Sequence, residues 1–174
     1  MSLLIQYTIL YASVLILVAL GGCFSEHSGV INLGLEGIMV MGALGGALTM
    51  KYMIGYPPAV IVILTILAAA VTGLVFSALL AVACINFKAD QTIVGTALNM
   101  LGLAAATVIV KAINIAENPD NVSATVQYIA QKKSFLVNIG GFEFNWFMLI
   151  AVLAVVAAYV TLYKTRFGLR LMAC

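Results

Sequence analysis

Five long apolar stretches constrain this chain more than any other feature. They cover residues 3–23, 29–50, 58–87, 92–110 and 146–163. Each approaches or exceeds the roughly 20 residues that an α-helix needs to cross the hydrocarbon of a bilayer. With 64% hydrophobic and only 8% charged residues, the chain has too little polar surface to enclose a water-soluble core. The sequence therefore predicts an all-α membrane protein with about five transmembrane helices.

The distribution of basic residues predicts the orientation of these helices. Lys164, Arg166 and Arg170 follow the last stretch, whereas no charged side chain precedes the first. Lysine and arginine beside a span favour the cytoplasmic side, so we expect a cytoplasmic C-terminus. Counting back through five spans places the N-terminus outside and makes residues 111–145 an extracytoplasmic loop. The formal net charge of +2 gives no reason to expect a nucleic acid partner.

A polar, glycine-rich segment at residues 24–37 joins the first two stretches. Asn32 and Glu36 are four residues apart, which predicts that both lie on one face of the second helix. An acidic or basic side chain facing lipid at mid-helix costs about 2.5–3.5 kcal/mol, so this face should line an interior or a cavity. The neighbouring glycines allow the second helix to be broken, as in helices that contact transported solutes. Both residues are candidates for a solute path, and hydrogen bonding between packed helices is the alternative.

The fourth stretch carries a stripe of amides and glycines at helical spacing. Its members are Gln91, Gly95, Asn99 and Gly102. The two amides are able to contact either a solute or a partner helix, and both interpretations stay open. Small residues let helices approach closely, so we expect Gly95 and Gly102 to pack against a neighbour. Gly42 and Gly46, a GxxxG pair in the second stretch, are expected to do the same.

Three motifs occur in order along the chain. They read SEHSGVINLGLEG at residues 25–37, ADQTIVGTALN at 89–99 and TRFGLRLMAC at 165–174. Together they resemble motifs in the permease subunits of ABC importers, within the branched-chain amino acid and simple sugar permease superfamily. The resemblance is greatest to the nucleoside-type permeases. It implies a multi-pass protein of a bacterial-type plasma membrane that passes a small polar solute.

The same resemblance implies several partners and one docking segment. The expected partners are an ATP-binding subunit, a second permease subunit in a homodimer or heterodimer, an extracytoplasmic solute-binding protein and the lipid bilayer. In the family, the third motif leads into the loop that couples the permease to the ATPase. This assigns coupling to Thr165, Arg166, Phe167, Gly168, Leu169 and Arg170. The family continues with further spans, so residues 1–174 are expected to form one permease domain truncated within the coupling loop, and not to transport alone.

Neither an enzyme nor a metal site is indicated by the sequence. It contains no GxxxxGK[ST] phosphate-binding loop, a single histidine and no cysteines at metal-binding spacing. We therefore expect no catalytic residue, metal or cofactor, and ATP hydrolysis on a separate subunit. The resemblance favours a nucleoside-type solute, with a simple sugar or another polar metabolite as the alternative. A small helical channel or scaffold without an ATPase partner is the rival function.

Overall fold

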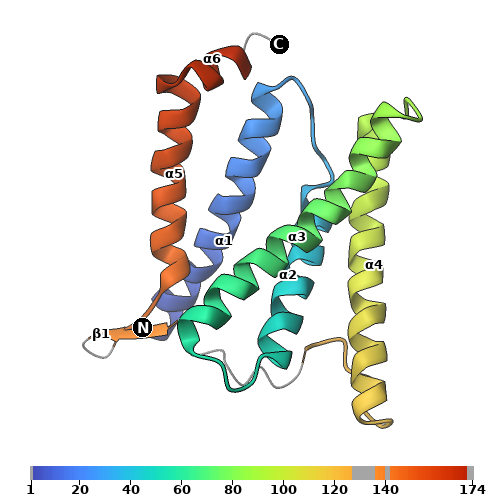
Figure 1. Ribbon diagram of the computed structural model, residues 1–174, viewed down its shortest axis with the longest axis vertical. Coiled ribbons are helices and arrows are strands. Elements are labelled where there is room, and N and C mark those ends of the chain that lie inside the picture. Colours follow the sequence, from blue (N-terminus) through green and yellow to red (C-terminus); the bar gives the residue numbers. More distant parts are fainter. Residues whose placement is uncertain (1, 127–135, 140–141, 172–174) are drawn as a thin grey trace. The chain divides into compact units, whose positions relative to one another are not determined.

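The computed structural model describes residues 2–126, 136–139 and 142–171 of the chain. Its elements are α1 (Ser2–His27), α2 (Leu35–Tyr52), α3 (Pro58–Ile85), α4 (Gln91–Glu117), β1 (Leu136–Ile139), β2 (Phe142–Asn145), α5 (Trp146–Lys164) and α6 (Arg166–Leu171) (Figure 1). Long helices make up most of this part of the chain. The two short strands pair antiparallel, with Leu136 opposite Asn145. The predicted all-α fold class is confirmed, and the hairpin is a small addition to it.

Four helices in the described part of the chain are long and apolar enough to cross a membrane. They are Leu4–His27, Pro58–Ile85, Gln91–Glu117 and Phe147–Lys164. This number is close to the predicted five. The predicted second span corresponds to α2, which is not among the four because Glu36 lies in its first turn and Lys51 in its last, and because glycines occupy several of its 18 positions.

α2 begins at Leu35, whereas the apolar pattern predicts a helix from Gly29. Residues 28–34 are not helical. Asn32 therefore precedes the helix, while Glu36 lies in its first turn. The prediction that these two side chains share a helical face is wrong, because a spacing of four residues has that meaning only inside a helix. The irregular part of this region is the approach to α2 and not a break within it.

The polar segment at residues 24–37 begins with a turn at the end of α1. Gly29 has a φ of +76°, in the left-handed region that glycine adopts without strain. The N–H of Gly29 donates to the carbonyl of Glu26, and the N–H of Val30 donates to the carbonyl of Ser25. The Ser25 hydroxyl in turn donates to the Val30 carbonyl at 2.7 Å. These residues thus pair backbone groups that the end of a helix leaves without partners.

α4 continues to Glu117, beyond the predicted end of the fourth span. The connection predicted at residues 111–145 therefore begins at Asn118. Within it, residues 127–135 and 140–141 lie outside the described part of the chain. The apolar pattern ends too early because polar residues occupy the last turns of α4, and a hydropathy argument reads them as loop.

One of these polar residues, Asn114, explains why the helix continues. Its side chain is only 1% exposed. Its amide nitrogen donates to the carbonyls of Ser123 and Thr125, each at 2.9 Å. The chain after α4 therefore folds back along the helix, and Asn114 is buried because its hydrogen bonds are made internally.

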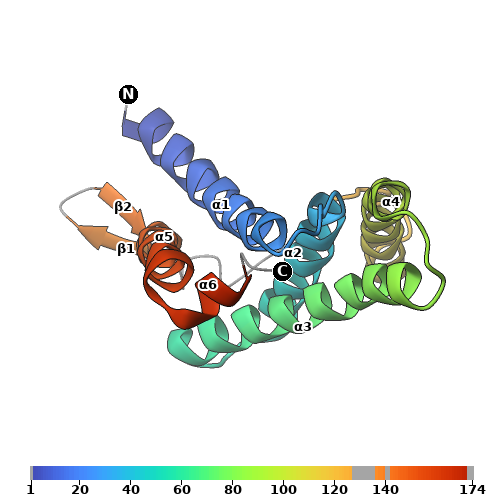
Figure 2. The ribbon, with the colours of Figure 1, turned by 90° about the horizontal axis from the view of Figure 1, so that it is seen from above.

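The chain forms two compact units. The first comprises residues 1–32 and 135–174, and the second residues 33–134. In the first unit α1 packs along α5, where the rings of His27 and Tyr163 meet edge to face with centroids 6.4 Å apart. α6 runs across the end of α5 (Figure 2).

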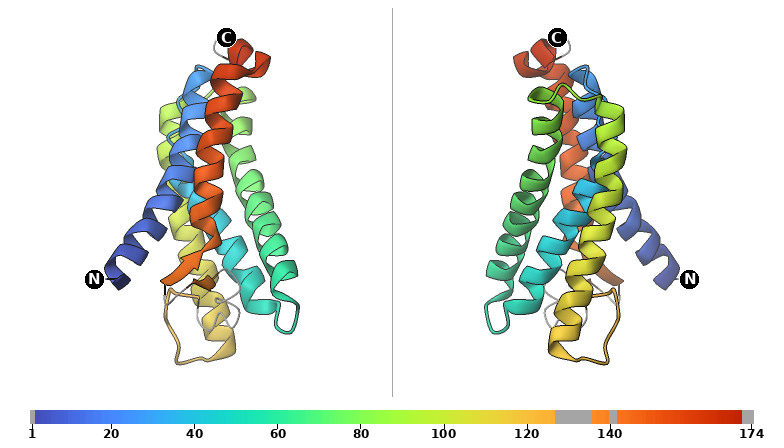
Figure 3. Two further views of the ribbon diagram at one scale, coloured as in Figure 1. Left: turned by 90° about the vertical axis from the view of Figure 1, so that its left-hand side faces the viewer. Right: turned by 90° about the vertical axis from the view of Figure 1, so that its right-hand side faces the viewer.

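In the second unit, α2 is the central helix and packs against both α3 and α4 (Figure 3, right). Toward α3, Gly42 and Gly46 lie against Ala69. Toward α4, Gly37 lies against the backbone at Leu98, where an added Cβ would be 2.6 Å from the carbonyl oxygen. The helix with too low a hydropathy to count as a span is therefore shielded by neighbours on two sides.

Replacing Gly102 with valine should separate α2 from α4. A Cβ at this position would lie 2.9 Å from the Cα and the carbonyl oxygen of Gly37, closer than such atoms normally approach. Overpacking costs about 1–3 kcal/mol, so we expect Gly102→Val to lower the Tm in detergent. The control is Ala104→Val on an exposed face of the same helix, which should leave the Tm unchanged. Equal losses in both variants would contradict the close approach of the two helices.

Asp90 caps the N-terminus of α4 (Gln91–Glu117) from outside the helix. Its carboxylate accepts hydrogen bonds from the N–H groups of Thr92 at 2.8 Å and Ile93 at 3.3 Å. These bonds favour the ionised form and hold the pKa of Asp90 below its ordinary value of 3.8. A group whose pKa is lowered by folding stabilises the protein above its unfolded pKa, and this contribution is lost as the pH falls through the folded pKa.

We expect Asp90→Ala to accelerate amide hydrogen exchange at Thr92 and Ile93, because both N–H groups lose their acceptor. Asp90→Asn keeps an acceptor and should exchange nearly as slowly as the wild type. As the pH falls through the lowered pKa of Asp90, the wild type should approach Asp90→Asn, because its carboxyl gains a proton but keeps a carbonyl acceptor. Exchange measured by mass spectrometry in detergent tests this, and equal rates for wild type and Asp90→Ala at neutral pH would rule out the cap.

Candidate functional site

The side chain of Asn99, on α4, joins that helix to the start of α2. Its Oδ1 accepts a hydrogen bond from the N–H of Gly37 at 2.7 Å. Its Nδ2 donates to the carbonyl of Leu33, also at 2.7 Å. The N-cap residue of α2 is Gly34, which makes no side-chain cap. Since the first N–H groups of a helix have no partners within it, Asn99 serves as a cap that comes from another helix.

Glycines bring the two backbones close enough for this bridge. A Cβ on Gly95 would lie 3.0 Å from the backbone nitrogen of Gly34 and from the Cβ of Leu33. One turn further along α4, a Cβ on Gly37 would meet the Cα of Asn99 at 3.0 Å. A short amide side chain can reach backbone groups of the neighbouring helix only at such a separation. We call this contact between α2 and α4 the α2–α4 seam.

A groove of about 320 Å³ lies along the seam beside the bridge. Its lining residues, three polar and three apolar, are Glu36, Val40, Thr96, Asn99, Met100 and Leu103. The Glu36 carboxylate has no hydrogen-bond or ion-pair partner within the described residues. A volume of this size falls within the range of small-molecule sites, and an unpaired carboxylate on a membrane helix normally faces an interior or an aqueous path.

The seam continues beyond this groove as an apolar surface. A second hollow of about 300 Å³ shares Val40 and Leu103 with the first and extends past Leu44 and Ala106 to Val110. Leu44, Ala106 and Val110 are buried and form an apolar cluster. The seam thus has a polar end near the start of α2 and an apolar remainder.

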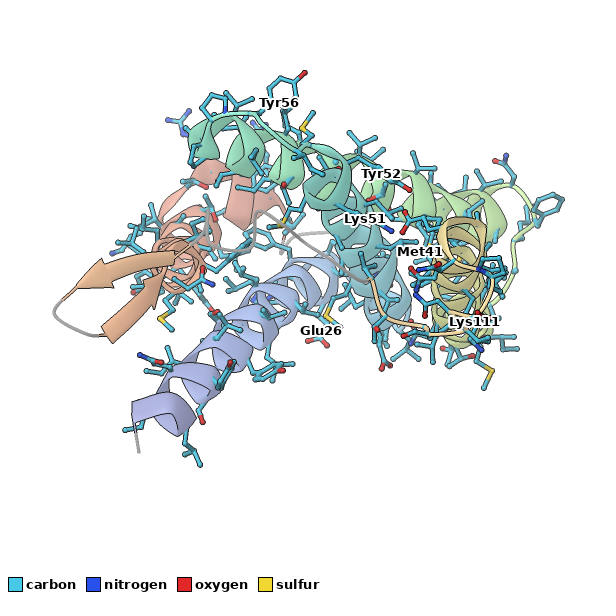
Figure 4. All side chains as sticks on the ribbon, turned by 90° about the horizontal axis from the view of Figure 1, so that it is seen from below. Glu26, Met41, Lys51, Tyr52, Tyr56 and Lys111 are labelled. Atoms are coloured by element: carbon cyan, nitrogen blue, oxygen red, sulfur yellow. The ribbon has the colours of Figure 1, made fainter. Side chains whose placement is uncertain are left out.

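An ion pair closes the opposite end of the seam. Lys51 Nζ contacts both carboxylate oxygens of Glu117, at 2.6 and 2.8 Å. The Lys51 side chain is 9% exposed and that of Glu117 50% exposed. Figure 4 shows Lys51 at the end of α2, on the side facing α4. A lysine in the last turn is also favourable for the helix dipole, so the pair fastens the ends of both helices.

The structure brings together only part of the predicted solute path. Glu36 and Asn99 line the same groove. Gln91 is the exposed first residue of α4 and does not line it. Asn32 belongs to the other compact unit. The sequence interpretation did not single out Thr96, although it lies inside the second motif and three residues before Asn99 on the same helix.

The segment predicted to couple to an ATPase forms the short helix α6 and its N-cap. The Thr165 hydroxyl donates to the carbonyl of Thr161 at 2.5 Å and accepts from the N–H of Gly168 at 3.4 Å. Gly168 is buried, and a side chain there would collide with the backbone of Leu162. The flanking side chains are exposed, namely Arg166, Phe167, Leu169 and Arg170. α6 is therefore held closely against α5 and presents a basic and apolar surface.

No metal centre is formed by the residues that the structure describes, because no three of their histidine, cysteine, aspartate or glutamate side chains come together. Cys23 and Cys84 are free thiols.

The apolar helices define a multi-pass membrane protein, and the permease family that it matches is one of the plasma membrane. Residues 4–174 match the family described as branched-chain amino acid transport system, permease component, and the chain belongs to that family. Permease subunits of this kind are not themselves catalytic. No solved structure matches the chain.

Two of the relatives match 98% of the chain. It is 39% identical to the guanosine ABC transporter permease protein of Bacillus subtilis, over 98% of this chain and 55% of the relative. It is 32% identical to the nucleoside ABC transporter permease protein of Lactococcus lactis, over the same shares of both. A putative glucose ABC transporter permease protein of Haloferax volcanii is 37% identical over 60% of this chain and 30% of that relative. The chain therefore spans about half the length of the first two relatives.

Removing the Asn99 amide should destabilise the second unit. Asn99→Leu leaves the Gly37 N–H and the Leu33 carbonyl without their partner. Gly37 is buried, and an unpaired buried group costs about 1–3 kcal/mol. We expect a lower Tm in detergent. Gln91→Leu, which removes an exposed amide from the same helix, is the matched control and should change the Tm little. A wild-type Tm for Asn99→Leu would show that the bridge contributes nothing to stability.

Proposed function

We propose that this chain is part of the membrane-spanning permease of an ABC importer that carries a small polar solute, with a nucleoside favoured, into the cell. The observation that carries the proposal is the unpaired carboxylate of Glu36 in a groove between two helices, in a chain of a permease family. A charged group inside a membrane protein marks a functional site by default. The relatives named for guanosine and nucleosides favour that class of solute.

Within this proposal, Glu36 and Asn99 belong to the solute path, and their roles differ. Asn99 uses one donor and one acceptor to hold the start of α2. Glu36 makes no such bond within the described residues, so its full capacity as an acceptor is available to a solute. Asn32 and Gln91, also predicted for the path, lack this support because neither lines the groove.

The energy for transport would come from a separate ATP-binding subunit. The surface of α6, with Arg166, Phe167 and Arg170 exposed, supports docking of such a subunit, and Lys164 beside it favours a cytoplasmic position. A second permease subunit and an extracytoplasmic solute-binding protein complete the proposed importer. The close packing of Gly168 on α5 supports transmission of movement from the docked subunit to that helix.

Uptake of radiolabelled guanosine into proteoliposomes tests the proposal. The permease, expressed from its complete gene, is reconstituted with its ATP-binding subunit and solute-binding protein. We expect uptake that requires ATP hydrolysis, disappears with an inactive ATP-binding subunit, and is reduced by excess unlabelled nucleosides but not by glucose. Competition by glucose alone would favour a sugar permease, which the relative from Haloferax volcanii suggests. Uptake that persists without the ATP-binding subunit would contradict an ABC importer.

A further inference from the structure

The polar end of the α2–α4 groove offers mostly hydrogen-bond acceptors. The Glu36 carboxylate only accepts when ionised. The Thr96 hydroxyl directs its hydrogen to the carbonyls of Thr92 and Ile93, at 3.1 and 2.9 Å, so its oxygen faces the groove as an acceptor. Asn99 keeps one unused amide hydrogen after bonding to Leu33. Glu36 and Thr96 can therefore receive hydrogen bonds from a solute, and of the three polar side chains only Asn99 can donate one.

The charge of this end is also negative. Glu36 has no cationic partner within the described residues. Lys51, the basic residue of the same helix, lies in the last turn of α2 and is paired with Glu117. A position fifteen residues further along a helix is about 22 Å away, well beyond the reach of direct pairing. A carboxylate with no local counter-charge attracts hydrogen-bond donors and repels anions.

The remaining wall of the groove is apolar. Val40, Met100 and Leu103 complete its lining. Met100 is 78% and Leu103 59% exposed, so their side chains present apolar surface rather than fill an interior. A flexible methionine adapts to flat or irregular apolar groups. The groove therefore fits a solute with a donor-bearing edge and an apolar face.

We infer that Glu36, Thr96 and Asn99 form a selectivity site that recognises uncharged solutes carrying adjacent hydroxyl donors beside a flat apolar group, and that disfavours their anionic derivatives. The inference rests on the proposed function and extends it by assigning the recognition of a vicinal diol to the permease itself. Glu36 would accept from the diol, Thr96 would accept a further donor, and the three apolar side chains would contact the flat group.

The test compares uptake of guanosine and 2′,3′-dideoxyguanosine by the complete importer in proteoliposomes. Each permease variant receives the same solute-binding protein, so that protein's own preference cancels when variants are compared. We expect the guanosine preference to fall on the order of tenfold in Glu36→Gln, because a neutral amide is a weaker acceptor than a carboxylate. Glu36→Asp keeps the charge and should keep more of the preference.

Thr96→Val is the second variant, because it retains the shape of the side chain and removes only the hydroxyl. It should lower the preference by a smaller factor, about threefold. Gln91→Leu is the matched control outside the groove and should leave the preference as in the wild type.

Two outcomes overturn the inference in different ways. If the wild type imports guanosine but the Glu36→Gln and Thr96→Val permeases keep its full preference over the dideoxy compound, the selectivity site is wrong and the proposed function stands. If the wild-type importer moves neither nucleoside, both the site and the proposed function are wrong. A reduced preference in Thr96→Val supports the site even where Glu36→Gln does not assemble.

Discussion

The two hydrogen bonds of the Asn99 side chain hold the polar end of the second unit together. A bilayer provides no water to pair with backbone groups, so each of them has to find a partner within the protein. The chain approaches α2 without helical structure, and Gly34 cannot cap the helix with a side chain. Asn99 provides the missing hydrogen-bond partners, since its side chain accepts from the Gly37 N–H and donates to the Leu33 carbonyl. The irregular approach to α2 is therefore stabilised by α4.

This bridge depends on glycines, which also explain the composition of α2. Gly37 on α2 and Gly95 and Gly102 on α4 remove the side chains that would keep the helices apart. Gly42 and Gly46 do the same on the face toward α3. Helices in a membrane associate through close packing. The hydrophobic effect does not drive them together, because lipid is as apolar as the side chains. Each glycine that permits this packing also lowers the hydropathy of α2, so the helix with the closest neighbours lacks the apolar character of a span.

Most of the fold can be predicted from the sequence, because a bilayer demands long apolar helices and such helices are visible in the chain. The predicted helix boundaries are wrong where polar residues have partners that are distant in the sequence. Asn114 and Glu117 extend α4 into a region that hydropathy assigns to a loop. The pairing of Lys51 with Glu117 gives no local signal, since 66 positions separate the two residues. The pattern of apolar residues indicates whether a segment lies in an apolar environment. It does not indicate which polar side chains contact one another.

The candidate site was predictable in a similar, partial way. The spacing along α4 predicts one face for Gly95, Asn99 and Gly102, and all three lie against the start of α2, whereas Gln91, at the exposed first position, does not continue the contact. The relation between Asn32 and Glu36 was misread because a helical period was applied to residues that precede the helix. An amide that bonds to the backbone of another helix leaves no complementary residue in the sequence, so the partner of Asn99 could not be inferred.

The sequence leaves two roles open for the membrane amides and carboxylate, a solute path or hydrogen bonding between helices. In the α2–α4 seam the Asn99 side chain forms hydrogen bonds between the helices, whereas Glu36 does not, and we propose that the solute contacts Glu36. Breaking the Asn99 bridge would leave the Gly37 N–H and the Leu33 carbonyl without this partner, which favours keeping α2 and α4 joined. Glu36 makes no bond to α4 and lies on the surface of the joined pair. The carboxylate is therefore reachable without separating the helices, and the bridge fixes the backbone from which its side chain extends.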